Sequence, residues 1–459
     1  MGFGVLGFGV WGLGFGVWGL AHIHIHIKMN VTQICVCMTG EAYTGKSTLV
    51  GRLMKDTGKV TDSQMKYIEA FSQKYHILTH HEDARLAYIA DKCNDERYRR
   101  VTFRTRAFEW QTGRHTVTLL DTPGYYRYIK SAIRGMSMSD HAALVVCVQS
   151  YERSWSQAML AYGMGIRRMT VLVNKVDLIR YCEKRFLEVK VECVGKLIEI
   201  GFKDQDLNFI PISVLENQNI LKTSDKMTWY KGPTFLDHIN SLECPLKRLD
   251  APFRFQILKV EKISGAGLVI SGRVMSGTIS EGQIITCMPG NFITQIKSLQ
   301  SWHTPISYAS AGDFVGLKSS HHTRHSLNRC TYIHAHTYTD THTTLARSML
   351  CVIHTLQSDI VLKVGVTGVV YVSRSRSPAT VLDILHRLDK VNDDIVEYRP
   401  DSIRLDCRYV VVLHLHNLLQ ACSRDAYGKM SSMVYMHSGE HVASGYAIEV
   451  YDKDGKLIE

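Results

Sequence analysis

Two adjacent segments predict a strand, a loop and a helix in succession: Val31-Thr-Gln-Ile-Cys-Val-Cys-Met38 and Gly40-Glu-Ala-Tyr-Thr-Gly45-Lys46-Ser47. The first segment is rich in Val, Ile and Cys, which predicts a buried strand. The second segment fits the pattern G-x-x-x-x-G-K-[ST], and Thr48–Lys55 after it has a helical pattern. A glycine-rich loop between a strand and a helix presents backbone N–H groups and a helix N-terminus. Together these predict a site for phosphate groups.

We expect the whole loop to contact a nucleotide. Its residues are Gly40, Glu41, Ala42, Tyr43, Thr44, Gly45, Lys46, Ser47 and Thr48. Lys46 would reach the β- and γ-phosphates, and the Ser47 hydroxyl would be a ligand of Mg²⁺. The alternative is an ordinary glycine-rich turn between a strand and a helix, and the motifs farther along the chain argue against it.

Four more short apolar runs predict strands, and helical patterns such as Glu183–Gly201 lie between them. The runs are Thr116–Leu120, Ala142–Val148, Thr170–Val173 and Asn208–Ile212. Strands that alternate with helices predict an α/β domain with a doubly wound, mostly parallel sheet. Such sheets bind ligands at the carboxyl ends of their strands.

One motif at a predicted strand end suits a phosphate and a metal ion. Asp121-Thr-Pro-Gly124 follows the second strand. Asp121 would hold Mg²⁺ through water, and Gly124 would let its N–H approach the γ-phosphate. The same four residues are also common in turns. The motif therefore indicates a phosphate and metal site only in combination with the other motifs.

Two further motifs suit a guanine base. Asn174-Lys175-Val-Asp177 ends the fourth strand, and Ser213 and Val214 follow the fifth. The Asp177 carboxylate can accept hydrogen bonds from the N1–H and the exocyclic amine of guanine, while Lys175 packs along the base. Ser213 would close the base pocket. The four motifs in this order favour a guanine nucleotide over a set of unrelated turns.

The sequence pattern changes near residue 245. From there the chain shows short β-branched runs broken by glycine, which are typical of a barrel or sandwich. They are Phe253–Val260, Gly267–Val274, Gly282–Met288 and Phe314–Leu317, and a second β-rich segment runs from Ala346 to about Val450. We therefore predict three domains: residues 29–240 are α/β, and residues 250–330 and 345–453 are each all-β.

Residues 1–28 have a different composition from the rest. Gly-Phe-Gly-Val-Trp-Gly-Leu occurs twice in tandem, and alternating His and Ile follow at positions 22–27. A basic n-region and a cleavage site are not evident, and the glycines would weaken a membrane helix. We interpret this segment as a low-complexity, disordered extension, with Met29 as a natural start.

The net charge indicates what kind of partner the protein binds, and the spacing of its cysteines indicates the redox state of its compartment. Lys and Arg number 54 against 43 Asp and Glu, and the net charge of +11 favours a polyanionic partner. The twelve cysteines include no C-x-x-C pair, which indicates a reducing compartment rather than a disulfide framework. After residue 28 no apolar run is long enough to span a bilayer, so we expect no membrane association.

On these motifs the chain resembles the translational GTPases of the elongation factor 1-alpha class, from about Met29 to Val450. Stretches such as Thr228-Trp-Tyr-Lys-Gly look most like the ribosome-rescue GTPase that partners Pelota, and the eukaryotic class II release factor is nearly as similar. The resemblance implies a P-loop G domain followed by two β-barrels, with GTP or GDP and Mg²⁺ as ligands. It also implies a cytoplasmic monomer that works on the ribosome with a tRNA or a tRNA-mimicking release or rescue protein.

The chain departs from this class where hydrolysis is concerned. The family places His directly after D-x-P-G, to position the attacking water, and Tyr125 stands in that catalytic position here. The family's R-G-[IV]-T reads Arg99-Arg100-Val101-Thr102, so Thr102 can still bind Mg²⁺ but Arg100 replaces glycine. The family's G-Q-T-R-E-H is degraded to Glu152-Arg-Ser-Trp-Ser-Gln157. We expect nucleotide binding to be preserved and hydrolysis to be impaired.

Three interpretations remain open at this point. The chain is a GTP-binding translation factor, or a pseudo-GTPase that holds GTP and scarcely hydrolyses it, or a decaying gene copy. Six arginines could contact RNA phosphates: Arg97, Arg99, Arg100, Arg104, Arg106 and Arg114. A solvated strand edge explains Arg104 and Arg106 equally well. Histidines at 321, 322, 325, 334, 336 and 342 are irregularly spaced, which argues against zinc.

Overall fold

The computed structural model describes residues 32–75, 85–263, 267–319, 327, 330–336, 345–355, 362–389 and 392–458. The predicted extension, residues 1–28, lies outside these ranges, as do His321, His322, His325 and His342.

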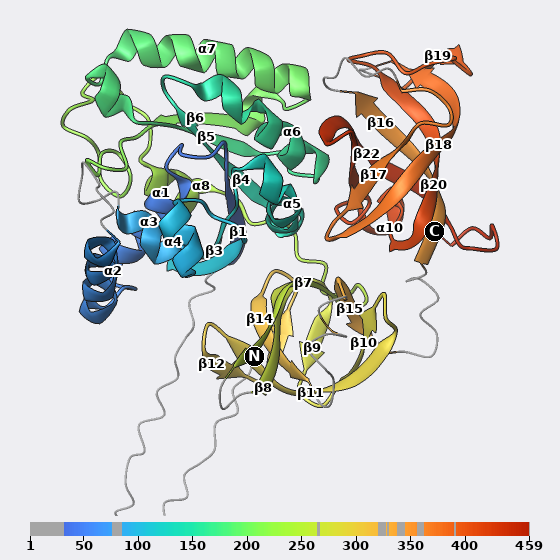
Figure 1. Cartoon of the computed structure of the whole chain (residues 1–459), viewed down its shortest axis with the longest axis horizontal. Coiled ribbons are helices and arrows are strands. Elements are labelled where there is room, and N and C mark those ends of the chain that lie inside the picture. The colour runs from blue at the N-terminus through green and yellow to red at the C-terminus, as the bar shows by residue number, and fades with distance from the viewer. Residues whose placement is uncertain are drawn as a thin grey trace, which may run out of the picture. The chain divides into compact units, whose positions relative to one another are not determined.

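The first domain is built on a six-stranded sheet (Figure 1). In chain order its strands are β1 (Thr32–Thr39), β2 (Arg106–Gln111), β3 (His115–Asp121), β4 (His141–Cys147), β5 (Met169–Asn174) and β6 (Leu207–Pro211). The spatial order is β2-β3-β1-β4-β5-β6, and only β2 is antiparallel to its neighbour. The predicted mostly parallel, doubly wound sheet is therefore confirmed.

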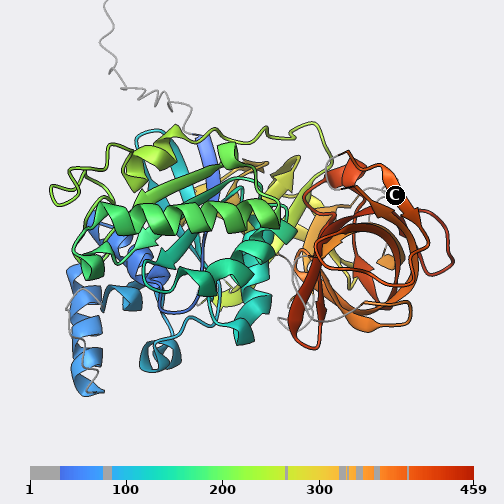
Figure 2. The same cartoon turned by 90° about the horizontal axis from the view of Figure 1, so that it is seen from above.

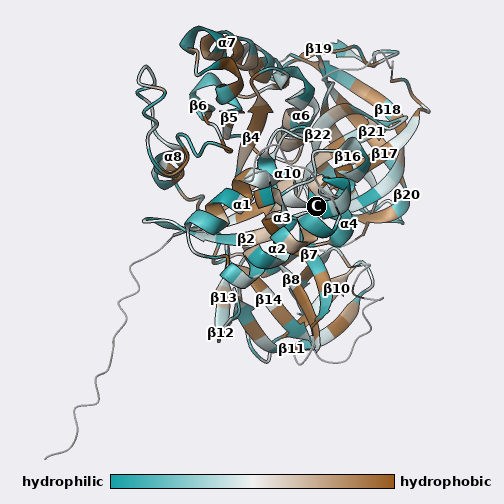
Figure 3. Cartoon of the chain, turned by 60° about the vertical axis from the view of Figure 1, so that its left-hand side comes forward, coloured by the Kyte–Doolittle hydropathy of each residue, from teal (hydrophilic) through white to brown (hydrophobic). Residues whose placement is uncertain are grey.

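Helices cover both faces of this sheet. They are α1 (Lys46–Asp56), α2 (Asp62–Lys74), α3 (Ala87–Ala90), α4 (Asn94–Arg99), α5 (Ile129–Met138), α6 (Trp155–Gly163), α7 (Glu183–Ile200) and α8 (Phe235–Ser241). Successive side chains of a strand point to opposite faces. Cys35 and Cys37 of β1 therefore pack with α5, α6 and α7, whereas Val36 and Met38 pack with α1 and α8. The hydrophobic colouring of β4 in Figure 3 is typical of a strand buried on both faces.

The second domain is a closed β-barrel. Its strands are β7 (Arg254–Ile263), β8 (Gly267–Ser276), β9 (Thr278–Ser280), β10 (Ile284–Met288), β11 (Phe292–Ser301), β12 (Thr304–Ile306), β13 (Tyr308–Ser310), β14 (Phe314–Ser319) and β15 (Tyr332–Ala335). The ring runs β10-β15-β7-β8-β14-β11, and pairing of β10 with β11 closes it. Apolar side chains such as Phe255 and Leu317 fill the interior.

The third domain is a second closed barrel, whose ring of strands is visible in Figure 2. Its elements are β16 (Leu345–Thr355), β17 (Thr367–Val372), β18 (Ser375–Leu388), β19 (Ile395–Tyr398), β20 (Arg408–Gln420), α10 (Arg424–Tyr427), β21 (Ser432–His437) and β22 (Glu440–Tyr451). The ring runs β17-β21-β22-β16-β20-β18, and β17 pairs with β18 to close it. The prediction of two all-β barrels after the α/β domain is confirmed.

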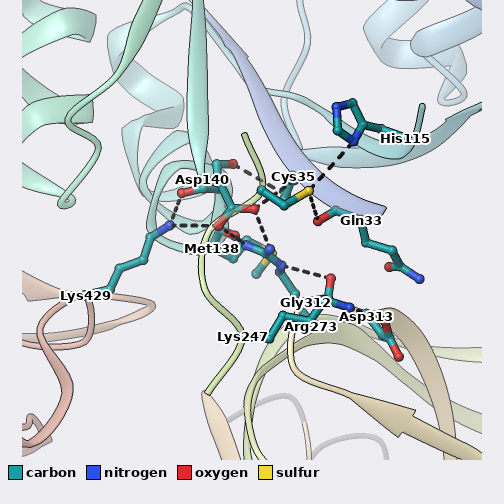
Figure 4. A network of polar contacts seen from close by, with 12 residues as sticks. Gln33, Cys35, His115, Met138, Asp140, Lys247, Arg273, Gly312, Asp313 and Lys429 are labelled. Atoms are coloured by element: carbon teal, nitrogen blue, oxygen red, sulfur yellow. Dashed lines mark hydrogen bonds and ion pairs between the residues drawn. The ribbon is translucent and has the colours of Figure 1, made fainter. Parts of the chain in front are cut away.

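A carboxylate after α5, only 13% exposed, connects the sheet domain to both barrels (Figure 4). Asp140 accepts hydrogen bonds from Arg273 of β8, at 2.8 and 2.5 Å, and from the N–H of Cys35 at 2.9 Å. Lys429 of the third domain lies 3.9 Å from the same carboxylate. Burial opposes ionisation of Asp140, but the charges of Arg273 and Lys429 outweigh it and hold its pKa below the usual range. Breaking this buried pair would leave an uncompensated charge.

Three expectations about sites elsewhere in the chain can be compared with the structure. All twelve cysteines are free. Within the described ranges, His, Cys, Asp and Glu form no cluster that could hold a metal ion by themselves. No helix in the part of the chain that the structure describes has the length and apolar character needed to cross a membrane.

Candidate functional site

The predicted motifs meet around a cavity of about 340 Å³. The residues in its wall that the sequence had predicted are Ala42, Tyr43, Gly45, Lys46, Ser47, Thr48, Thr102, Gly124, Tyr125, Asn174, Lys175, Asp177 and Val214. The loops after β1, β3, β5 and β6 supply most of them, because the carboxyl ends of parallel strands lie at one edge of the sheet. Segments far apart in the sequence therefore form one site.

Five predicted residues do not line this cavity. They are Gly40, Glu41, Thr44, Asp121 and Ser213. Two of these hold wall residues in place: the Thr44 carbonyl accepts a hydrogen bond from Asn174 Nδ2 at 2.7 Å, and Ser213 Oγ donates to Asp177 Oδ1 at 2.6 Å. Ser213 therefore acts on the site through Asp177.

Lys46 is the buried cation of the phosphate loop. Its ammonium donates a hydrogen bond to the Glu41 carbonyl at 2.6 Å. Burial lowers the pKa of Lys46 to about 8, and the nearby carboxylates of Asp121 and Glu41 oppose that effect. The amine therefore carries a charge at neutral pH inside the loop, where the sequence motif predicts phosphate.

Two glycines allow close packing around the phosphate loop. Gly45 has φ of 102°, in the left-handed region, and a Cβ there would lie 2.4 Å from Asn174 Nδ2. A Cβ on Gly124 would lie 2.5 Å from the Gly40 carbonyl oxygen and 2.6 Å from Lys46 Nζ. Because Gly124 has no side chain, the backbone of the loop after β3 packs directly against the phosphate loop. The D-x-P-G sequence predicts this close approach.

Hydroxyl and carboxylate oxygens gather next to the start of α1. Ser47 Oγ lies 2.9 Å from Thr102 Oγ1, which donates a hydrogen bond to Asp91 Oδ1 at 3.0 Å. Burial raises the pKa of Asp121 to about 6, against the hydrogen bond from Ser47 and the charge of Lys46. Asp121 Oδ1 is buried and has no hydrogen-bond partner among the described residues. An oxygen-only donor set with an orphaned carboxylate oxygen fits the ligand preference of Mg²⁺.

Asp91 is a site residue that the sequence analysis missed. It directly follows α3, lines the cavity and is only 3% exposed. Burial raises its pKa to about 8, and the charges of Asp121 and Glu96 add to that effect. A divalent cation bound next to Asp91 would favour the ionised carboxylate and so lower this pKa again. The only signal in the sequence is an acidic residue at the end of the short apolar run Ala87–Ala90.

The base side of the cavity is fixed by two buried polar side chains. Asn174 bridges two loops, because its Nδ2 binds the phosphate loop and its Oδ1 accepts the N–H of Val214 at 3.1 Å. Arg52 of α1, which was not predicted as part of the site, donates to the carbonyls of Val214 at 3.2 Å and Leu215 at 3.0 Å. The Val214 loop is therefore tied to both α1 and β5.

The segment from Glu152 to Gln157, which departs from the family and continues into α6, still contacts the site. Gln157 accepts a hydrogen bond from Thr39 Oγ1 at 3.4 Å, and its amide lies 3.5 Å from the Gly124 carbonyl. Ser154 Oγ accepts the N–H of Glu41 at 3.3 Å. Tyr125, at the position of the family's His, lines the cavity with 47% of its surface exposed.

The arginines singled out in the sequence have different environments. Arg97 is 7% exposed and donates to the Asp91 carbonyl at 2.7 Å, and Arg106 pairs with Glu96 at 2.5 Å. These two side chains hold the segment around α3 and α4 together, so the RNA interpretation is wrong for them. Arg99, Arg100, Arg104 and Arg114 are exposed.

Comparisons with known proteins agree with this geometry. A family model described as the elongation factor Tu GTP binding domain matches residues 31–245. Elongation factor 1-alpha of Pyrococcus furiosus is 30% identical over 386 residues, which cover 82% of this chain and 88% of that protein. Elongation factor 1-alpha of Nanoarchaeum equitans is also 30% identical, over 427 residues that cover 92% of this chain and 97% of that protein.

Solved structures share the fold. The GTPase-like domain of Saccharomyces cerevisiae Ski7, bound to GDP and inorganic phosphate, superposes with a TM-score of 0.72 at 18% identity, over 91% of this chain and 97% of that chain. Elongation factor SelB from Methanococcus maripaludis, in complex with a GTP analogue, has a TM-score of 0.67 at 14% identity, over 93% of this chain and 81% of that chain. At these identities the likeness shows the architecture alone.

Proposed function

Because the chain belongs to the elongation factor 1-alpha family of translational GTPases, we propose that it is a GTP-binding translation factor that works as a Mg²⁺-dependent switch on the ribosome. The observation that carries this proposal is the convergence of the phosphate loop, Gly124 and Asp177 on one cavity. The phosphate loop would hold the phosphates, and Asp177 would select guanine. Ser47, Thr102 and Asp121 would hold Mg²⁺, which offsets the negative charge of the phosphates.

Two segments of the wall would respond to the terminal phosphate. Thr102 follows α4, and Gly124 follows β3. Both residues lie close to the phosphate loop in the structure. With GTP bound, their hydroxyl and N–H groups would be ordered by the phosphate and its metal ion. Loss of the phosphate would release both segments and change how α5, which follows Gly124, is held against the barrels.

A cluster of cations supports a tRNA, or a protein that mimics one, as the cargo. Its members are Arg104, Lys130, Arg134 and Arg376, from the segment after α4, from α5 and from the third domain. Burial, and then the like charges of Arg104 and Arg376, lower the pKa of Arg134. In the described ranges none of these four makes an ion pair, so their charge is available to the phosphates of an RNA or to an acidic protein surface.

A pseudo-GTPase is the second candidate, and Tyr125 favours it. A neutral imidazole can orient an attacking water and accept its proton, whereas a phenol is a much poorer acceptor of that proton. In that case the chain would bind GTP and its ribosomal partner without useful hydrolysis. The two candidates share the nucleotide site and differ only in turnover.

Co-sedimentation with ribosomes tests the proposal. We expect the protein to pellet with ribosomes when loaded with a non-hydrolysable GTP analogue and to remain in the supernatant with GDP. Equal pelleting in both nucleotide states would contradict a switch. Single-turnover GTP hydrolysis with and without ribosomes then separates the two candidates, because only the GTPase is accelerated by ribosomes.

A further inference from the structure

Arg100 occupies a backbone position that favours glycine. It caps the C-terminus of α4 with φ of 54° and ψ of 37°, and its N–H lies against the carbonyls of Glu96 and Arg97. A left-handed C-cap is the usual place for glycine, because a Cβ there strains the backbone. Arginine at this position therefore strains the backbone, and glycine would avoid that strain. Strained backbone conformations occur preferentially at functional sites.

Arg100 is part of the wall of the proposed nucleotide cavity. Arg100 lines the cavity together with Tyr88, which is 3% exposed. Burial raises the pKa of the Tyr88 hydroxyl, and the nearby charge of Arg100 partly offsets that effect. The guanidinium of Arg100 therefore lies near Tyr88, a second residue of the cavity wall.

The position along the chain places Arg100 beside the metal-binding end of the cavity. Arg100 precedes Thr102 by two residues, and Thr102 Oγ1 lies 2.9 Å from Ser47 Oγ. Gly124 and Tyr125 belong to the same wall. The bulk of Arg100 therefore does not keep this segment away from the phosphate loop.

We propose that Arg100 binds the terminal phosphate of the bound nucleotide, so that the chain distinguishes a nucleoside triphosphate from a diphosphate with an arginine of its own. This inference rests on the proposed GTP-binding function. A guanidinium offers a planar set of N–H donors that matches phosphate oxygens and keeps its charge at every physiological pH. An arginine supplied in cis also stabilises negative charge on a phosphoryl group during its transfer. The family's glycine at this position cannot make either contribution.

Nucleotide affinities of matched variants test the proposal. The probes are fluorescent GDP and a fluorescent non-hydrolysable GTP analogue, titrated in Mg²⁺ into the full chain. Arg100→Gly removes the side chain and suits the left-handed backbone. Arg100→Lys keeps a charge without the planar donors. Arg99→Ala is the control, because Arg99 is an exposed neighbour outside the cavity wall.

We expect Arg100→Gly to lose roughly ten- to hundredfold in affinity for the GTP analogue while GDP affinity stays within about twofold. Arg100→Lys should lie between it and the wild type, and Arg99→Ala should match the wild type. An unchanged ratio of the two affinities in Arg100→Gly would overturn the proposal, and so would an equal loss for both nucleotides, which would mean that Arg100 only supports the loop. A wild-type chain that binds neither nucleotide would overturn the proposed function as well.

Discussion

The Thr102 hydroxyl lies 2.9 Å from the Ser47 hydroxyl, across 55 residues of sequence. Ser47 lies in the first turn of α1, and Thr102 belongs to the segment in which Arg100 replaces the glycine expected from the family. The substitution therefore leaves the contact between Ser47 and Thr102 in place. If hydrolysis is slow, we expect the cause to be the position of the attacking water next to Tyr125 rather than a segment that fails to close.

Replacing Lys46 with alanine should abolish tight GTP binding. Lys46 is the one phosphate-loop side chain in the described structure that carries a positive charge, and it lies close to the buried carboxylates of Asp121 and Asp91. Its loss would remove the cation that faces the phosphates of the nucleotide and leave only these acidic side chains beside them. Isothermal titration with GTP in Mg²⁺ measures the effect. Lys66→Ala on the exposed surface of α2 is the control, and an unchanged affinity in Lys46→Ala would show that the loop is only a turn.

Replacing Tyr125 with histidine should speed GTP hydrolysis. The imidazole would orient a water next to Gly124, and phosphoryl transfer depends mostly on such positioning and on electrostatics. Tyr126→His is a matched control, because Tyr126 is similarly exposed but does not line the cavity. Single-turnover hydrolysis with ribosomes gives the rates. If the wild type already hydrolyses GTP like an ordinary member of the family, or if Tyr125→His brings no gain, the assignment of the defect to Tyr125 fails.

Acid should destabilise the first domain through two buried histidines that share one hydroxyl. Thr170 Oγ1 lies 2.7 Å from Nε2 of His141 and 2.6 Å from Nε2 of His238. Burial lowers the pKa of His141 to about 3 and that of His238 to about 4. The unfolded chain binds protons below about pH 6.5, whereas the native histidines stay neutral. Their contribution to stability is therefore complete above about pH 6.5 and is lost as the pH falls toward 4, at roughly 1.4 kcal/mol per pH unit for each histidine.

The variant His238→Gln isolates one of these two groups. Between pH 7 and pH 5, its free energy of unfolding in urea should fall by about 2 kcal/mol less than that of the wild type. His303→Gln should follow the wild type, because His303 is exposed. Identical pH dependence of the wild type and His238→Gln would contradict the buried, neutral state of this pair.

The parallel strands and their loops could be predicted because each carries a local signal. A buried strand such as His141–Cys147 is a continuous apolar run, and a ligand loop such as Asn174–Asp177 directly follows one. The edge strand β2 (Arg106–Gln111) was not predicted. Its buried Phe108 and Trp110 alternate with charged and polar residues, and its pairing partner follows it along the chain. Pairing with β3, rather than composition, makes this segment a strand.

The missed site residues depend on contacts between distant segments. Asp91 meets Thr102 only because the chain turns between α3 and α4, and Arg52 meets the Val214 loop across 162 residues. In the sequence, Asp91 and Arg52 are single charged residues of the kind usually found on a solvated surface. Their burial follows from the tertiary structure, so no spacing rule could identify them.

The choice of base at Asp177 distinguishes a guanine-nucleotide site from any other phosphate site. The Asp177 carboxylate is held by Ser213 at 2.6 Å and lines the cavity. Replacement by asparagine should remove two charge-assisted hydrogen bonds to guanine, each worth ~1.5–3 kcal/mol, while the amide can pair with xanthine. The measurement is competition of GTP and XTP for binding to the wild type and to Asp177→Asn. We predict that the wild type strongly prefers GTP and that the variant shifts its preference to XTP; equal affinity of the wild type for GTP and XTP would contradict the account.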